Sequence, residues 1–459
     1  MFLHSKFVVV DDKEHHLRGI KETLDSLRID CHSKLYEDEA VGEWTALPGT
    51  RILFLDQNLV TGATFGTADN KVAVTAIQDV ITKVICPDSG PYGLILWAEE
   101  PDLETLKASL FERFTGDEAR YLPVFFAALQ KGEYIDTNDG RVKNPVKLQE
   151  DIVSRLSQNP QMKALLSWET DVAVAAGAVL RSIVNLVPMS KRSSDDFSKE
   201  LGNVLYRLSQ AGAGIDRAEE NPREAINHVL VPILADRITE HDPQGDAGDA
   251  WKSAIVSHPD KFASIPVQAA INTAIHVSRA TSPNSAPILP TDLGAVIEFP
   301  FENEQNTLSD LFDLSVEKFR QDTFFGMHEQ DWEKCALRLV QIGASCDHAQ
   351  PKDGPLLYLL ALEWPYQNAD GSRVDSAKLH AKKSSKSGLE WKTPSILVGD
   401  DLVPGKLSVF LNCTFSAKRG DVTNWNAVYR LREELASKLT QEFARHISRP
   451  GILTMSPDD

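Results

Sequence analysis

Residues 7–12 read Phe-Val-Val-Val-Asp-Asp, and residues 52–56 read Ile-Leu-Phe-Leu-Asp. Each stretch is a short apolar run that ends in a carboxylate. Runs that are apolar throughout, rather than at every second position, are typical of parallel strands that are buried on both faces. The two stretches therefore predict two strands of a parallel sheet, each with an acidic side chain at its carboxyl end.

The residues around these stretches follow the same plan. Helical patterns cover 14–27, 71–84 and 103–114, and further strand candidates cover 29–35, 92–98 and 121–126. Short strands that alternate with helices are typical of an α/β domain with helices on both faces of the sheet. We therefore predict a doubly wound parallel-sheet domain over residues 1–135.

Three acidic residues are predicted to meet at one edge of this sheet. Asp11 and Asp12 end the first strand, and Asp56 ends the strand at 52–55. Ligands of doubly wound sheets gather at the carboxyl ends of the strands. Three converging carboxylates repel one another without a cation, and a set of oxygen ligands suits a hard ion such as Mg²⁺. The sequence predicts a divalent-metal pocket.

These two stretches resemble the acidic pair and the phospho-acceptor segment of response-regulator receiver domains, which have a flavodoxin/CheY-like fold. The resemblance implies that Asp11 and Asp12 hold Mg²⁺ and that Asp56 takes a phosphoryl group from a histidine kinase. It also implies that Asn58 offers its backbone carbonyl to the metal. The chemistry is coherent, because a carboxylate is a competent nucleophile and a metal offsets charge on the transferring group.

Two positions depart from the receiver pattern. Receivers carry Thr or Ser at the end of the fourth strand, where this chain has Trp97-Ala98. They also carry Lys directly after the fifth strand, whereas the strand predicted at 121–126 is not followed by one and Lys131 lies several residues further on. Both side chains normally contact the phosphoryl group. Two outcomes stay open: the pocket accepts phosphate without signalling it, or it does not accept phosphate.

The middle of the chain, residues 145–242, is predicted to be a helical domain that forms a bundle. Asn159-Pro160, Pro188 and the glycines at 212–214 divide it into separate helices. Trp168-Glu169 is a candidate contact between these helices and the first domain. Apolar residues recur at helical spacing in four groups: Leu148, Ile152 and Leu156; Val172, Ala176, Leu180 and Val184; Leu201, Leu205 and Leu208; and Ile226, Leu230 and Leu234.

Residues 250–459 are predicted to form an α+β or β-rich domain that ends in a long amphipathic helix at 425–447. The strand candidates are 295–299, 337–342, 356–362 and 407–411. Cys346, Asp347 and His348 are the residues of this part with the most reactive side chains. A thiol beside a base is a candidate nucleophile or metal ligand, but a turn with a buried cysteine fits the same residues.

Composition excludes several classes of protein. The 459 residues carry 48 Lys and Arg against 66 Asp and Glu, a formal charge of −18, which argues against a nucleic-acid partner. The short basic run at 378–386 is expected to be a solvated loop. The five cysteines form no Cys-x-x-Cys pair, which argues against a zinc ribbon. No signal peptide or membrane span is expected, so we predict a cytoplasmic protein without a membrane partner.

The sequence thus favours a regulatory phospho-acceptor rather than a conventional enzyme. Its expected partners are a histidine kinase or another signalling protein, and a downstream effector protein, in a two-component-like pathway. The nearest setting by resemblance is a Detocs-like bacterial phage-defence system. Two alternatives stay open. One is an effector hydrolase or nuclease that uses Cys346 and His348 and is gated by a degenerate receiver. The other is a non-catalytic scaffold with an inert pseudo-receiver.

Overall fold

The chain divides into two compact units. Unit 1 comprises Met1–Gly177 and Ile238–His258, and unit 2 comprises Ala178–Arg237 and Pro259–Asp459. The computed structural model describes residues 6–60, 70–192, 196–240, 247–255, 264–280, 286–302, 304–319, 332–344, 348, 354–366 and 389–448.

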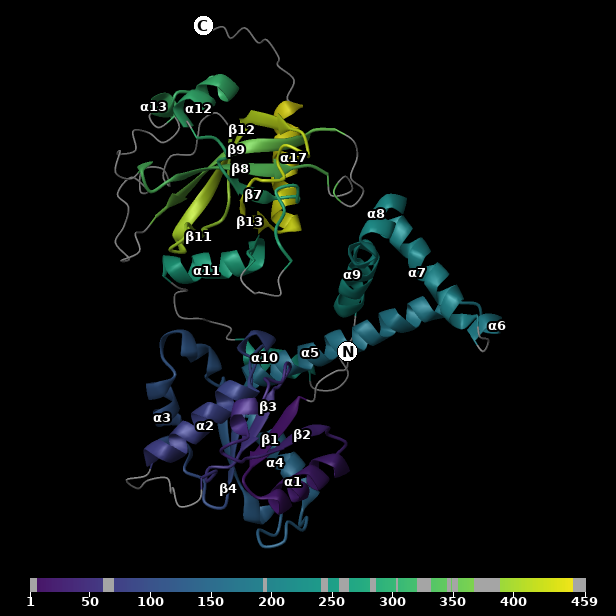
Figure 1. Cartoon of the computed structure of the whole chain (residues 1–459), viewed down its shortest axis with the longest axis vertical. Coiled ribbons are helices and arrows are strands. Elements are labelled where there is room, and N and C mark those ends of the chain that lie inside the picture. Colours follow the sequence, from purple (N-terminus) through teal and green to yellow (C-terminus); the bar gives the residue numbers. More distant parts are fainter. Residues whose placement is uncertain are drawn as a thin grey trace. The chain divides into compact units, whose positions relative to one another are not determined.

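Unit 1 is built on a five-stranded sheet in which every neighbouring pair of strands is parallel (Figure 1). The order of the strands is β2-β1-β3-β4-β5, so the chain reverses its direction of winding after β2. The parallel sheet predicted from the continuous apolar runs is confirmed. The strands are β1 (Phe7–Asp11), β2 (Cys31–Leu35), β3 (Ile52–Leu55), β4 (Gly93–Ala98) and β5 (Phe125–Gln130).

Helices cover both faces of this sheet. One face packs against α2 (Asn70–Val84) and α3 (Leu103–Arg113), and the other packs against α1 (Glu14–Ser26) and α4 (Pro145–Ser157). Successive strand residues alternate between the two layers, because side chains of a strand point to opposite faces. This double burial explains why β3 is apolar throughout and why β1 is apolar up to Val10.

The predicted position of the fifth strand is wrong. Residues 116–121 form a 3-10 helix, and β5 runs from Phe125 to Gln130 rather than from 121 to 126. Ala127 and Ala128 are poor strand formers on their own, and β5 forms because it pairs with β4 along its whole length. As a result, Lys131 directly follows the last strand.

Helices dominate the middle of the chain, as predicted. One ion pair joins α5 to the residue before β3: the Arg51 guanidinium donates to both carboxylate oxygens of Glu169, at 2.9 and 3.1 Å. The neighbouring Trp168 is 50% exposed, so Glu169 makes the predicted contact with the first domain. The helices are α5 (Pro160–Asn185), α6 (Met189–Arg192), α7 (Phe197–Ala213), α8 (Ile215–Glu220), α9 (Pro222–Glu240) and α10 (Ala247–Ala254).

The C-terminal part is β-rich and antiparallel. Its sheet has the order β10-β12-β9-β8-β7-β13-β6, and β11 also pairs with β12. The four strands predicted there are confirmed. The strands are β6 (Val277–Ser278), β7 (Ala295–Glu298), β8 (Ala336–Ile342), β9 (Leu356–Pro365), β10 (Glu390–Lys392), β11 (Ile396–Val398), β12 (Val403–Ala417) and β13 (Ala427–Leu431).

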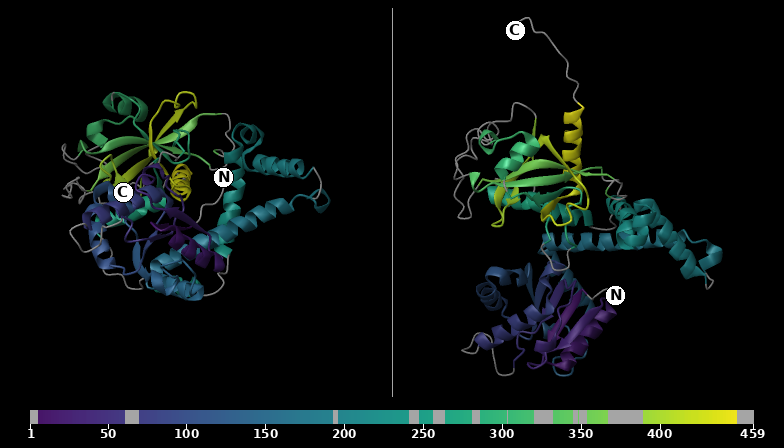
Figure 2. Two further views of the ribbon diagram at one scale, coloured as in Figure 1. Left: turned by 60° about the horizontal axis from the view of Figure 1, so that its bottom comes forward. Right: turned by 45° about the horizontal axis from the view of Figure 1, so that its top comes forward.

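Helices also lie on both faces of the antiparallel sheet. Figure 2 shows α17 (Glu433–Ile447) along one face, where Leu435 and Leu439 join the apolar core. The opposite core includes Leu308 of α12 (Glu304–Phe312) and Phe319, just after α13 (Val316–Lys318), and α11 (Ile265–His276) packs beside β11.

The predicted helix at 425–447 begins too early. Residues 427–431 form β13, and α17 starts only at Glu433, after the extended Arg432. Tyr429 and Leu431 are buried at alternate positions and pair with β7 and β6, and this pairing overrides the helical pattern. Among the described residues, none of the helices has the length and apolar character that a membrane-spanning segment needs.

Candidate metal and phosphoryl-acceptor site

Three carboxylates meet at the carboxyl edge of the parallel sheet. Asp11 is the last residue of β1, Asp12 follows it, and Asp56 follows β3. Because β1 and β3 are adjacent and Val10 pairs with Leu55, the residues after them reach the same place. One oxygen of each carboxylate lies within 4.8 Å of the others. The convergence predicted from the sequence is confirmed.

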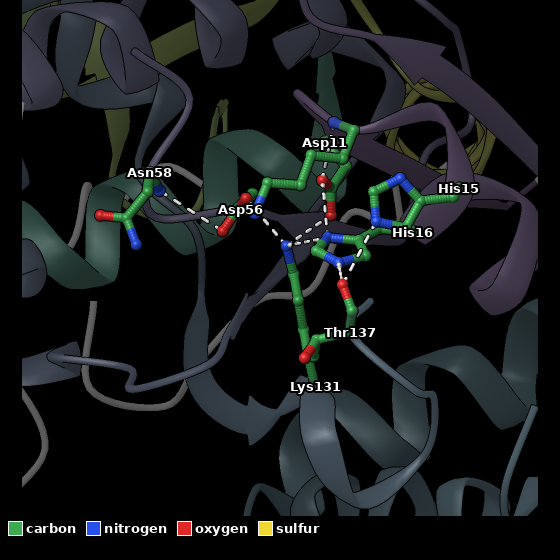
Figure 3. A network of polar contacts seen from close by, with 8 residues as sticks. Asp11, His15, His16, Asp56, Asn58, Lys131 and Thr137 are labelled. Carbon is green, nitrogen blue, oxygen red and sulfur yellow. Dashed lines mark hydrogen bonds and ion pairs between the residues drawn. The ribbon is translucent and has the colours of Figure 1, made fainter. Parts of the chain in front are cut away.

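Lys131 bridges two of these carboxylates (Figure 3). Its ammonium nitrogen lies 2.6 Å from Asp11 Oδ2 and 2.8 Å from Asp56 Oδ2, and its side chain is 2% exposed. The interpretation that Lys131 stands too far along the chain is therefore wrong. It followed from placing the fifth strand four residues too early.

His16 is a member of the site that the sequence analysis missed. Its Nδ1 lies 3.3 Å from the Lys131 ammonium and 3.4 Å from Asp11 Oδ1, and its Nε2 lies 2.9 Å from the Thr137 carbonyl oxygen. His15 Nε2 lies 3.2 Å from the same oxygen. One signal was available: His16, Ile20 and Leu24 share the buried stripe of α1, and a histidine in an apolar stripe needs a polar partner.

Burial and the neighbouring charges together shift the pKa values of Asp11 and Asp12 in opposite directions. Burial alone would raise the pKa of Asp11, but the adjacent His16 side chain and the ammonium of Lys131 outweigh it, so the pKa lies below its ordinary value. Burial, followed by the charges of Asp56 and Asp11, raises the pKa of Asp12 to about 6. Lys131 thus compensates Asp11, while Asp12 has too little compensating charge.

The residues present fit a hard divalent cation. All the converging donors are carboxylate oxygens, which Mg²⁺ prefers. Within the part of the chain that the structure describes, Asp12 Oδ1 is buried and has no hydrogen-bond partner. Asn58 lies beside Asp56, and its backbone N–H donates to Asp56 Oδ1 at 3.3 Å. Asp11, Asp12 and Asp56 could therefore hold the metal, with the Asn58 carbonyl as the predicted backbone ligand.

The end of β4 carries no hydroxyl. Trp97 is fully buried, stacks on Tyr134 with ring centroids 5.6 Å apart, and meets Phe54 edge to face. Ala98 is also fully buried. The Trp97 indole is part of the apolar core between the sheet and α4. At this position the chain therefore has a core-packing side chain in place of the hydroxyl of the receiver pattern.

The Cys346, Asp347 and His348 group is not tested as a site. Cys346 and Asp347 lie outside the described residues, as does the basic run at 378–386. His348 is described and belongs to unit 2, where it borders a cavity of about 480 Å³ together with Arg419 and Thr440.

Comparisons with protein-family models, with curated proteins and with solved structures found no match to this chain. A function for this chain therefore has to be argued from the acidic pocket itself.

Proposed function

We propose that unit 1 contains a receiver-type domain with a flavodoxin-like sheet, in which Asp56 accepts a phosphoryl group from a partner histidine kinase. The observation that carries this proposal is the Lys131 ammonium, which contacts the carboxylates of Asp11 and Asp56 at the carboxyl edge of the sheet. A cation and an acidic pair around one further carboxylate are the groups that phosphoryl transfer to a carboxylate requires.

Each residue has a defined part in the transfer. A carboxylate oxygen of Asp56 attacks phosphorus, the bond from phosphorus to the donor nitrogen breaks, and the leaving nitrogen takes a proton. The product is an acyl phosphate on Asp56. Lys131 then donates to a phosphoryl oxygen instead of to Asp56, and the Asn58 N–H keeps Asp56 oriented. Mg²⁺ held by Asp11 and Asp12 would offset the charge of the phosphoryl oxygens.

The wider setting extends this proposal. A downstream effector protein, a two-component-like pathway and a role in phage defence rest on the receiver resemblance. A nucleic-acid partner is not part of this proposal, because the formal charge of −18 disfavours one.

Phosphoryl uptake is the direct test. The full chain is incubated with Mg²⁺ and phosphoramidate, and intact-mass spectrometry counts the phosphoryl groups bound. We expect one group per chain, its loss in Asp56→Asn and in excess EDTA, and normal uptake in the matched variant Asp117→Asn, whose carboxylate is exposed at the surface of unit 1. Uptake that persists in Asp56→Asn, or no uptake by the unmodified chain, would refute the proposal.

One observation favours a second candidate, an inert receiver that serves as a binding scaffold. Trp97 and Ala98, both fully buried, end β4, where receivers carry the hydroxyl that binds the new phosphoryl oxygen. In a scaffold, Asp56→Asn would leave both the fold and partner binding unchanged, whereas a phospho-acceptor would lose its response to the kinase. The third alternative, a hydrolase or nuclease at Cys346, depends on residues outside those described.

A further inference from the structure

His16 occupies an unusual place for a histidine. Its side chain is 1% exposed, on the inner face of α1, and it is surrounded by three polar groups: the Lys131 ammonium, the Asp11 carboxylate and the Thr137 carbonyl (Figure 3). None of the steps of phosphoryl transfer proposed above uses this imidazole. A buried imidazole destabilises the fold unless its ring nitrogens have hydrogen-bond partners, so the partners of His16 indicate its role.

The partners fix which nitrogen carries the proton. The Thr137 carbonyl can only accept, so His16 Nε2, at 2.9 Å, must donate to it. In the neutral ring Nδ1 is then the acceptor, and the Lys131 ammonium, at 3.3 Å, is the donor that faces it. The ring thus joins the cation of the pocket to a backbone carbonyl 121 residues away in the sequence from His16.

The carbonyl itself is held in place. Thr137 lies in a turn in which Gly140 N donates to the Asp136 carbonyl and Asp136 N donates to the Arg141 carbonyl. This turn touches α1 backbone to backbone: Gly140 has φ +76°, and a Cβ on it would lie 2.1 Å from the His15 carbonyl oxygen. The turn is therefore anchored to α1, the helix that carries His16.

The same segment leads to α4. Tyr134 lies between Lys131 and the turn, stacks on Trp97, and donates its hydroxyl proton to Asp151 of α4 at 2.7 Å. Residues 131–134 therefore form a short, packed stretch of chain between the pocket and the next helix. This segment is one physical connection from Lys131 to α4.

We propose that His16 is a positioning residue that holds Lys131 in the acceptor pocket and couples its position, through Thr137, to residues 131–143 and α4. The inference rests on the proposed phosphoryl transfer to Asp56. When Lys131 exchanges Asp56 for a phosphoryl oxygen, His16 follows the ammonium, and the bond to Thr137 carries that shift into the turn.

Two isosteric variants separate the two bonds. Asn places its amide oxygen about where Nδ1 lies, so His16→Asn keeps an acceptor for Lys131 and loses Thr137. Gln places its amide nitrogen about where Nε2 lies, so His16→Gln keeps the donor to Thr137 and loses Lys131. His16→Leu removes both, and His32→Asn, on an exposed position of β2, is the control.

Two readouts are measured on the full chain with Mg²⁺: the rate of phosphoryl uptake from phosphoramidate, and the hydrogen exchange of the amides at 136–140. We expect the rate of uptake to fall about tenfold or more in His16→Gln and His16→Leu, because removing a residue that orients a reacting group typically has an effect of this size. The rate should stay near normal in His16→Asn. We expect faster exchange in His16→Asn and His16→Leu, and normal protection in His16→Gln.

The outcomes distinguish this inference from the proposed function. If the unmodified chain takes up no phosphoryl group, the proposed function fails, and exchange at 136–140 in His16→Leu still tests the link to Thr137. If the unmodified chain is phosphorylated but His16→Leu matches it in uptake and exchange, the inference fails alone. Identical behaviour of His16→Asn and His16→Gln would also overturn it, even if His16→Leu does not fold.

Discussion

Replacing Lys131 by Met is the perturbation whose effect the structure defines best. Met keeps most of the length and apolar stem of Lys but removes its charge. The ammonium lies 2.6 Å from Asp11 Oδ2 and 2.8 Å from Asp56 Oδ2. All three residues are 5% exposed or less, so water cannot replace the lost cation without opening the pocket.

The expected loss is large for one substitution. Removing one partner of a buried ion pair costs about 3–5 kcal/mol, because the remaining charge stays buried without compensation. Protonation of a carboxylate relieves part of this cost, so we expect about 3 kcal/mol in the free energy of unfolding of unit 1. For a unit of this size the melting temperature should fall by about 6–12 °C. Mg²⁺ should restore about 2–3 kcal/mol at a concentration near 100 times its dissociation constant.

Native-state hydrogen exchange of the β1 and β3 amides measures the opening of unit 1 by itself. The measurement is made in EDTA and in Mg²⁺, with Lys21→Met on the exposed side of α1 as the matched control, expected to lie within about 0.5 kcal/mol of the unmodified chain. The double variant with Asp56→Asn should lose less than the sum of the two single variants. A loss below about 1 kcal/mol in EDTA would refute the reasoning.

Three further predictions concern single charges. Burial and the charges of Asp56 and Asp11 raise the pKa of Asp12 to about 6, so the folded unit binds a proton more tightly than the unfolded chain. Ionised Asp12 therefore destabilises the fold as the pH rises from 3.8, the ordinary pKa of an aspartate, through about 6. Asp12→Asn should therefore stabilise the metal-free protein at pH 7 by about 1 kcal/mol, after discounting for solvent screening, and this gain should shrink towards pH 4. Urea unfolding at both pH values measures the gain, and a gain that does not depend on pH would contradict the prediction. Glu169→Gln weakens the two-bond pair with Arg51 and should cost about 1 kcal/mol of unit 1 stability in hydrogen exchange, with no change in phosphoryl uptake. Glu363 is 2% exposed and accepts from Arg338 Nε at 2.8 Å and from the Gly399 N–H at 3.1 Å. Glu363→Gln should lower the free energy of opening, measured by hydrogen exchange of the β8 and β9 amides, by about 3 kcal/mol. A loss under about 1 kcal/mol would show that the ion pair is not buried in solution.

The parallel sheet and its acidic edge could be predicted because both are encoded locally. Residues 7–10 and 52–55 are apolar at every position, and the acidic residues follow within one or two positions of each strand end. The topology then brings the ends of adjacent parallel strands together without any further information. Asp11, Asp12 and Asp56 could be placed in one pocket for this reason.

Lys131 and His16 could not be placed in the same way. They are 115 residues apart, and their contact depends on where β5 ends and on which face of α1 is buried. An error of four residues in one alanine-containing strand moved Lys131 out of the predicted pocket. The start of α17 was misplaced for a related reason: residues 427–431 fit an amphipathic helix, and only pairing with β7 and β6 makes them a strand.

The balance of charge in the pocket would link a bound divalent cation to Lys131. The Lys131 ammonium contacts the carboxylates of Asp11 and Asp56, and burial together with the charges of these two residues raises the pKa of Asp12. A divalent cation bound at Asp12 and Asp11 would supply the missing charge and would also weaken the hold of Asp11 on Lys131. The ammonium would then have two remaining partners, Asp56 and His16 Nδ1. Metal binding should therefore free Lys131 to meet a phosphoryl oxygen on Asp56, while His16 keeps it from leaving the pocket, and by linkage a phosphoryl group should in turn tighten the binding of the metal.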